Sequence, residues 1–137
     1  MNPESVLTSR IMIIDDSALI QRIIEGILRR EGYQVSSFNH GPEAMEALMT
    51  QRVDVPDLIF MDIGLPIMDG YTAARFFRQK EAFDQTVIVM ISGNDGMFDR
   101  IRGRMAGAKA YITKPFKPGE ILDVVHQFLH DVPALAH

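Results

Sequence analysis

Three aspartates, one serine and one lysine each stand where a short apolar run of this 137-residue sequence stops. Asp15 and Asp16 follow IMII, Asp62 follows LIFM, Ser92 follows VIVMI, and Lys114 follows AYIT. Carboxylates bind divalent cations and can attack phosphorus, a hydroxyl can donate to a phosphate oxygen, and an ammonium group neutralises phosphoryl charge. If the fold brings them together, these five residues predict a site for phosphoryl transfer.

The aspartates require a compensating cation, because carboxylates gathered in a partly dry site raise one another's pKa values. Oxygen ligands without nearby His or Cys favour Mg²⁺, which is often shared with phosphate oxygens. We therefore expect Asp15 and Asp16 to bind Mg²⁺ and Asp62 to be the nucleophile that forms an aspartyl phosphate. Lys114 is expected to neutralise phosphoryl oxygens, and Ser92 to donate its hydroxyl to one of them.

Each of these residues, taken alone, has an ordinary structural explanation. The aspartate pair suits the N-cap of a helix, a single strand-end aspartate is common in turns, and Ser92 also suits a turn. A lone lysine is usually a solvated loop residue, although Pro115 restricts Lys114 to extended geometry. The prediction therefore depends on the combination of these residues at successive strand ends.

Five segments have the character of β-strands. Residues 11–14, 58–61 and 87–91 are continuous apolar runs, too short for helices and without polar alternation, as expected of strands buried on both faces. Residues 34–38 and 110–113 are weaker strand candidates. The strands alternate with segments of helical spacing, in which Gly32 and Gly107 predict helix ends while Pro42 and Pro118 suit first turns.

The apolar stripes of the helical segments are expected to face the core. They are Ile20, Ile23, Ile24, Ile27 and Leu28; Ala44, Ala47 and Leu48; Ala73, Ala74, Phe76 and Phe77; Phe98, Ile101 and Met105; and Ile121, Leu122, Val125, Phe128 and Leu129. The alternation predicts an α/β fold of (βα)5 type, a doubly wound, flavodoxin-like parallel sheet of five strands in the order 2-1-3-4-5. Ligands bind such sheets beyond the carboxyl ends of the strands, where the five polar residues converge.

Composition and charge argue against several classes of function. Hydrophobic residues make up 47% and charged residues 23%, the net charge is −4, and there is no cysteine. An acidic chain is not attracted to nucleic acid or anionic lipid, and without cysteine there are no disulfides, zinc thiolate sites or thiol catalysis. No apolar run reaches the roughly 18 residues of a membrane span, and the N-terminus lacks a signal-peptide pattern. We expect a cytoplasmic protein that binds neither nucleic acid nor membranes.

Four segments, IMIIDDS, DLIFMDIGLPIMDGY, VIVMISGNDG and GAKAYITKPF, resemble the response-regulator receiver family of two-component signalling. The resemblance implies a signalling switch, not a turnover enzyme, that is phosphorylated by a histidine kinase. The phosphorylated protein would then present a changed surface, formed by its fourth helix, fifth strand and fifth helix, to a downstream protein. We expect a receiver domain over residues 10–130, tails at 1–9 and 131–137, and a monomer or a phosphorylation-dependent dimer. The Met1 start and the short final tail favour a whole gene product.

The family resemblance also implies individual roles. Asp62 is implied as the phosphoacceptor and also as a ligand of Mg²⁺, with Asp15 and Asp16 as the acidic pair for that ion and the backbone carbonyl of Gly64 as a further ligand. Gly64 and Asn94 would flank the phosphoryl group and influence how quickly water removes it.

The switch residues are implied in the same way. Ser92 would be the hydroxyl switch, Tyr111 the aromatic switch, and Lys114 the family lysine, joined to Pro115 by a cis peptide bond. Tyr111 would move into the space that Ser92 vacates when Ser92 approaches the phosphoryl group. A half-buried edge tyrosine without a switching role is the alternative for Tyr111.

A narrower resemblance links the segment NDGMFDRIRGRMAGAKAYITKPF to PilG-type regulators of type IV pilus twitching motility. It implies a chemotaxis-like kinase and a motility apparatus as partners. Arg100, Arg102 and Arg104 would suit an acidic partner, and they equally suit a solvated helix face.

Particular residues of this chain argue against three other functions. A phosphatase of the haloacid dehalogenase type needs a second aspartate two residues after the nucleophile, where this chain has Gly64. A dinucleotide or flavin carrier would have a Gly-x-Gly-x-x-Gly motif after the first strand, and here two aspartates stand there instead. A receiver-like interaction module that works without phosphorylation is disfavoured because all five key side chains are present.

Overall fold

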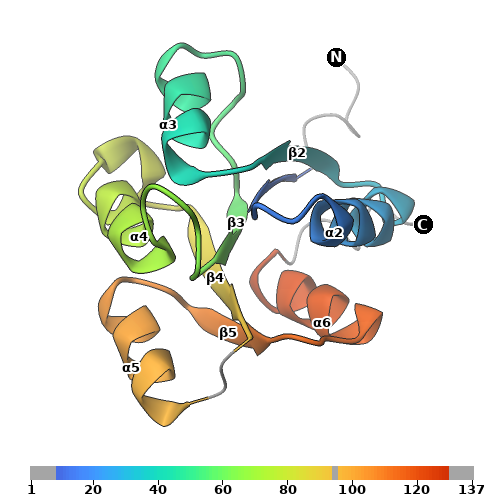
Figure 1. Cartoon of the computed structure of the whole chain (residues 1–137). Helices are drawn as coiled ribbons and strands as arrows, with labels where there is room; N and C mark the ends of the chain where they lie inside the picture. Colours follow the sequence, from blue (N-terminus) through green and yellow to red (C-terminus); the bar gives the residue numbers. More distant parts are fainter. Residues whose placement is uncertain (1–8, 94–95, 130–137) are drawn as a thin grey trace.

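The computed structural model of the chain describes residues 9–93 and 96–129. In chain order the elements are β1 (Arg10–Ile14), α2 (Ala18–Arg30), β2 (Gln34–Phe38), α3 (Gly41–Met49), β3 (Leu58–Asp62), α4 (Gly70–Arg78), the 3₁₀ helix η1 (Glu81–Phe83), β4 (Val87–Ser92), α5 (Met97–Met105), β5 (Ala110–Thr113) and α6 (Pro118–Phe128). The strands form one parallel sheet in the order β2-β1-β3-β4-β5 (Figure 1), which confirms the predicted fold and strand order. None of the helices in these described ranges has the length and apolar composition of a membrane span.

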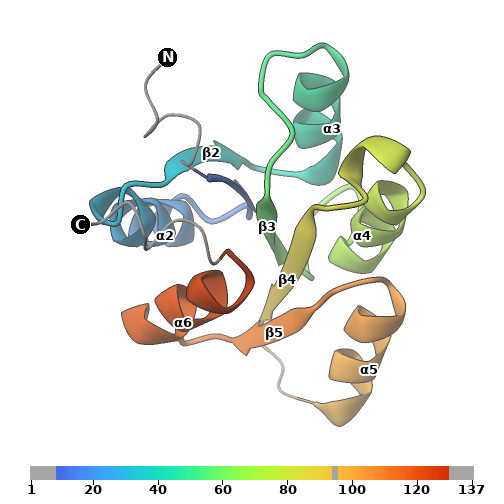
Figure 2. The ribbon, with the colours of Figure 1, turned by 180° about the vertical axis from the view of Figure 1, so that it is seen from behind.

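Helices cover both faces of the sheet, with α2 and α6 on one face and α3, α4 and α5 on the other, as the two opposite views show (Figures 1 and 2). Successive side chains of a strand point to opposite faces. In β1, Ile11 and Ile13 therefore join the core beneath α2 and α6, while Met12 and Ile14 join the core beneath α3 and α4. Burial on both faces explains why the strand sequences are continuously apolar.

Local capping leaves the aspartates at the end of β1 available for other contacts. The side chain of Ser17, and not that of either aspartate, caps α2 by accepting a hydrogen bond from the Ile20 amide. Asp69 caps α4 in the same way, with the Thr72 amide as donor. Asp15 and Asp16 are thus not consumed as helix caps.

Helix α5 contradicts one sequence prediction. Its stripe Phe98, Ile101 and Met105 was expected in the core, but these side chains are between 50% and 82% exposed. The physical reason is Gly103, the buried residue of the helix: a Cβ there would lie 3.5 Å from Met90 Cγ, so the backbone of α5 itself approaches the sheet. The glycine side faces inward and the apolar stripe faces solvent. The expectation also fails for Ile23 in α2, which is 40% exposed.

The close approach of α4 to β3 gives a stability prediction. A Cβ on Gly70 would lie 2.6 Å from the carbonyl oxygen of Asp62 and 2.8 Å from the Cα of Ile63. Gly70→Ala is expected to lower the free energy of unfolding by about 1–3 kcal/mol, the usual cost of overpacking. Denaturant titration measures this change.

Gly26→Ala is the matched control, because nothing lies within 4 Å of a Cβ at this position inside α2. Alanine replaces glycine in a helix interior there, so a gain of about 0.5–1 kcal/mol is expected. Equal changes in the two variants would contradict the close packing of α4 on β3.

Candidate functional site

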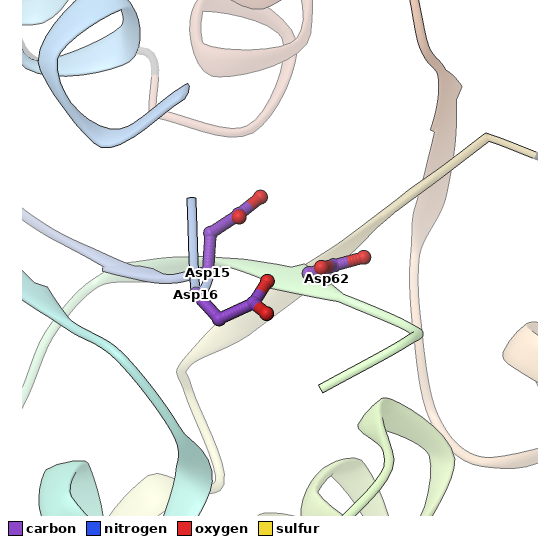
Figure 3. A group of neighbouring side chains, drawn as sticks. All are labelled: Asp15, Asp16 and Asp62. Carbon is purple, nitrogen blue, oxygen red and sulfur yellow. The ribbon is translucent and has the colours of Figure 1, made fainter. Parts of the chain in front are cut away.

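Three aspartates converge at the carboxyl edge of the sheet. β1 and β3 are parallel neighbours, with Ile14 paired to Met61, so Asp15 and Asp62 follow at the same edge. Asp15, Asp16 and Asp62 each contribute one carboxylate oxygen to a group in which these three atoms lie within 4.8 Å of one another (Figure 3). The predicted convergence is confirmed for these three side chains.

Asp15 is the most deeply buried member of the group, at 1% exposure. Its Oδ1 accepts a hydrogen bond from the Ser17 amide at 2.8 Å. Its Oδ2 is buried without a hydrogen-bond donor among the described residues, although the ammonium group of Lys114 lies 3.2 Å away. A buried carboxylate oxygen that accepts no hydrogen bond costs free energy unless a cation lies beside it.

Lys114 is the basic side chain of the site and comes from the end of β5. Its Nζ lies 3.2 Å from Oδ2 of Asp15 and 3.7 Å from Oδ2 of Asp62, so one ammonium group contacts two carboxylates. Its backbone amide donates to the carbonyl oxygen of Ser92 at 2.7 Å, which fastens this loop to β4. The peptide bond from Lys114 to Pro115 is cis.

Asp62 lies at the end of β3 and is 9% exposed. Burial raises the pKa of its carboxyl above the ordinary value, and the charge of Asp15 raises it further. The charge of Lys114 and a hydrogen bond from the Gly64 amide, 3.2 Å from Oδ1, lower this pKa, while Asp16 raises it again. The net shift of this pKa is upward, so burial and the neighbouring carboxylates together outweigh Lys114 and the Gly64 amide.

The donor atoms of this cluster fit Mg²⁺. They are carboxylate oxygens from three residues, one of them the buried Oδ2 of Asp15 that accepts no hydrogen bond. Hard oxygen donors of this kind suit Mg²⁺ better than softer metals. Gly64, whose carbonyl was expected as a further ligand, lies two residues beyond Asp62 with its amide against the Asp62 carboxylate.

Other residues predicted for the site lie on the neighbouring strands. Asp62 pairs in register with Ile91, so buried Ser92 stands one residue further along β4. Tyr111 is half-buried in β5, three residues before Lys114. Asn94, predicted as a flanking residue, lies outside the described residues.

Gln21 is a supporting residue that the sequence analysis missed. Its side-chain amide donates to the carbonyl oxygen of Asp15 at 2.6 Å, and to Phe38 and Asn39 at the end of β2. These bonds hold the loop that carries the acidic pair between two strand ends. The sequence contains no signal for this role, because a polar residue among the apolar positions of a helix equally suits a solvated position.

Comparison with known proteins adds independent observations. The family model described as "Response regulator receiver domain" matches residues 11–126. Protein PilG of Pseudomonas aeruginosa is 35% identical over 116 residues, which cover 85% of this chain and 84% of PilG. Chemotaxis protein CheY of Bacillus subtilis is 33% identical over 125 residues, covering 90% of this chain and all of CheY. The chain spans less than half of some longer relatives, for example 46% of Bacillus subtilis PhoP.

A solved structure with the same fold contains the metal for which this cluster is suited. It is the receiver domain of the sensor histidine kinase PA1611 from Pseudomonas aeruginosa, with a magnesium ion coordinated in its active-site cleft. It is 30% identical to this chain, covers 90% of it and 98% of its own length, and superposes with a TM-score of 0.77.

The charge imbalance of the cluster gives a stability prediction. Because burial and neighbouring carboxylates disfavour the charged form of Asp62, Asp62→Asn is expected to raise the unfolding temperature by a few degrees at neutral pH without divalent cations. Asp84→Asn, which removes an exposed carboxylate next to η1, is expected to leave it unchanged. Calorimetry compares the variants, and a lower unfolding temperature for Asp62→Asn would refute the inferred repulsion.

Proposed function

This chain belongs to the response regulator receiver domain family, and on that premise we propose that it is a phosphoacceptor switch of a two-component system. Asp62 accepts the phosphoryl group from a phosphohistidine of a histidine kinase. The observation that carries this proposal is the position of the Asp62 carboxylate, within 4.8 Å of two other aspartates and 3.7 Å from the Lys114 ammonium group.

Phosphoryl transfer here needs positioning and charge neutralisation. A carboxylate oxygen of Asp62 forms a bond to phosphorus while the P–N bond to the donor histidine breaks, and the imidazole leaves with the electron pair. The ammonium group of Lys114 already contacts two carboxylates, and in the proposed reaction it neutralises charge on the added phosphoryl oxygens. Mg²⁺ held by Asp15, Asp16, Asp62 and the carbonyl of Gly64 would supply further neutralisation of phosphoryl charge.

The proposed response to phosphorylation is a shift in the populations of the protein's conformations. It begins at Ser92 and Tyr111. Ser92 at the end of β4 donates its hydroxyl to the phosphoryl group, and Tyr111 on the neighbouring strand moves with it. Tyr111 lies beneath α5, where a Cβ on Gly103 would be 3.7 Å from its ring. A change at Tyr111 therefore reaches the surface formed by α5, β5 and α6.

The surface of α5, β5 and α6 has features that suit a downstream protein. A hollow of about 220 Å³ lies between α5 and β5 and is bordered by the cationic side chains Arg100, Arg104 and Lys109. The exposed apolar side chains Phe98, Ile101 and Met105 lie on α5 as well, the helix that carries Arg100 and Arg104. Local positive charge on a chain with a net charge of −4 favours an acidic partner with apolar anchor residues.

Resemblance to PilG and to the chemotaxis protein CheY supports a pathway with a chemotaxis-like kinase, and motility control is the pathway we propose. The proposed switch does not turn over an external substrate, although it promotes loss of its own phosphoryl group. Cytoplasmic localisation, the domain limits at residues 10 and 130, and a monomer or phosphorylation-dependent dimer stay predictions.

Phosphorylation is tested by incubating the protein with Mg²⁺ and acetyl phosphate and measuring its intact mass. The wild type is expected to gain one phosphoryl group, and Asp62→Asn to gain none because its carboxylate nucleophile is absent. Asp84→Asn is the control, since its exposed side chain lies outside the acidic cluster, and it should react like the wild type. A folded wild type that gains no mass would instead indicate an interaction module that works without phosphorylation.

The phosphate lifetime is tested at the two flanking positions. Gly64→Asn and Asn94→Ala are each expected to change the rate of dephosphorylation while Mg²⁺ binding survives. At Gly64 the nearest atom to a new Cβ would be Asp62 Oδ1 at 4.0 Å, so a side chain fits beside the phosphoacceptor. Decay is followed by intact mass after removal of the donor, and Mg²⁺ binding by titration. Identical rates of dephosphorylation in the wild type and both variants would contradict the role assigned to Gly64 and Asn94.

A further inference from the structure

Helix α5 is held by two arginine–tyrosine stacks, one on each side of the helix. The guanidinium group of Arg102 lies 4.2 Å from the ring centre of Tyr71 in α4, and that of Arg100 lies 4.8 Å from the ring centre of Tyr111 in β5. We propose that Arg100 is a positioning residue that couples helix α5 to Tyr111, while Arg102 and Tyr71 anchor the helix to α4. This proposal rests on the function proposed above and assigns a residue to its internal coupling.

The anchor on the α4 side is buried and has two components. The hydroxyl of Tyr71, a residue that is 4% exposed, donates to the carbonyl oxygen of Asp99 at 3.2 Å. Burial raises the pKa of Tyr71, and the charge of Asp99 raises it further, so the hydroxyl keeps its proton at neutral pH. The Tyr71 ring, with Arg102 stacked on it, therefore fastens the first turns of α5 through a hydrogen bond and a cation–π contact.

The contact on the β5 side involves two residues of the strand. Besides stacking on Tyr111, Arg100 donates to the hydroxyl oxygen of Thr113 at 3.3 Å. Thr113 pairs in register with Ser92 and directly precedes Lys114. Arg100 thus contacts β5 at the aromatic residue and one position before the lysine of the acidic cluster.

The rest of α5 contributes little apolar packing that would hold the helix independently. Gly103 is the buried residue within α5, and the large apolar side chains of this helix are exposed. Most helix stability in proteins comes from packing of an apolar face, so α5 depends on its polar and aromatic contacts more than α2 or α6 does. A displacement of the Tyr111 ring must therefore break the Arg100 contact or carry α5 with it.

Amide hydrogen exchange of α5, measured on the full chain without phosphodonor, tests the contact. Arg100→Ala is expected to increase exchange of the α5 amides by at least roughly two- to five-fold, the effect of losing a partly exposed cation–π contact, and loss of the Thr113 hydrogen bond adds to it. Arg104→Ala is the control: it removes the same charge from the same helix, and the Arg104 side chain makes no hydrogen bond, ion pair or ring contact with the described residues. Equal exchange in the two variants overturns the proposal.

A pair of Tyr111 variants distinguishes coupling through the ring from a general structural effect. Tyr111→Phe keeps the ring, so Arg100→Ala should still raise α5 exchange in that background. Tyr111→Leu removes the ring, so the same substitution should have a smaller effect there, because the stack is already absent while the hydrogen bond to Thr113 is kept. An undiminished effect of Arg100→Ala in the Tyr111→Leu background overturns the proposed coupling.

Acetyl phosphate and Mg²⁺ then separate this proposal from the proposed function. Intact mass reports whether Asp62 is modified, and both wild type and Arg100→Ala should gain the phosphoryl group. Phosphorylation should change α5 exchange in the wild type and change it less in Arg100→Ala. An equal change in both proteins, or none in the phosphorylated wild type, overturns the coupling. Absence of mass gain in both refutes the proposed function, and the donor-free variants still decide whether Arg100 couples α5 to Tyr111.

Discussion

Repulsion among three carboxylates at the edge of the sheet is the constraint that the rest of the structure must tolerate. Asp15, Asp16 and Asp62 have oxygens within 4.8 Å of one another, and in the described part of the chain Lys114 is the one cation in ion-pair contact with them. Like charges so close together in a partly dry site cost free energy. The same imbalance favours the binding of a cation at this site.

The sheet supplies the stability that holds this cluster together. β1 and β3 are buried on both faces, and their ladder of backbone hydrogen bonds runs up to the aspartates. Asp15 and Asp62 cannot move apart without breaking that ladder and exposing both apolar cores. Strand order matters for the same reason: with β1 between β2 and β3, the loop that carries Asp15 faces the end of β3 and is held by Gln21 from the side of β2.

The sequence predicted those features that follow from burial and from strand ends. Continuous apolar runs identified the central strands, and the polar residue after each run identified the acidic cluster and Lys114. Gln21 was not predictable, since its hydrogen bonds depend on where two strand ends meet in space. The orientation of α5 was not predictable either: apolar spacing shows that a helix has an apolar stripe, but not whether that stripe faces the core or a partner. Gly103 decided the orientation by allowing the helix backbone to approach the sheet.

In the proposed switch α5 must move at small cost, and its outward apolar stripe fits that requirement. Burying a large apolar side chain contributes about 1.5–3 kcal/mol, so placing Phe98, Ile101 and Met105 in the core would hold the helix by roughly 5 kcal/mol or more. Reversing a two-state equilibrium from 1:99 to 99:1 already needs about 5.5 kcal/mol of differential interaction. In the proposed switch, a helix packed in that way would raise this requirement by a comparable amount. With its apolar residues in solvent and its position set by stacks on Tyr71 and Tyr111, α5 can respond to a far smaller change. The exposure that contradicts the core pattern and the small cost of movement that the proposed switch requires therefore have one physical origin.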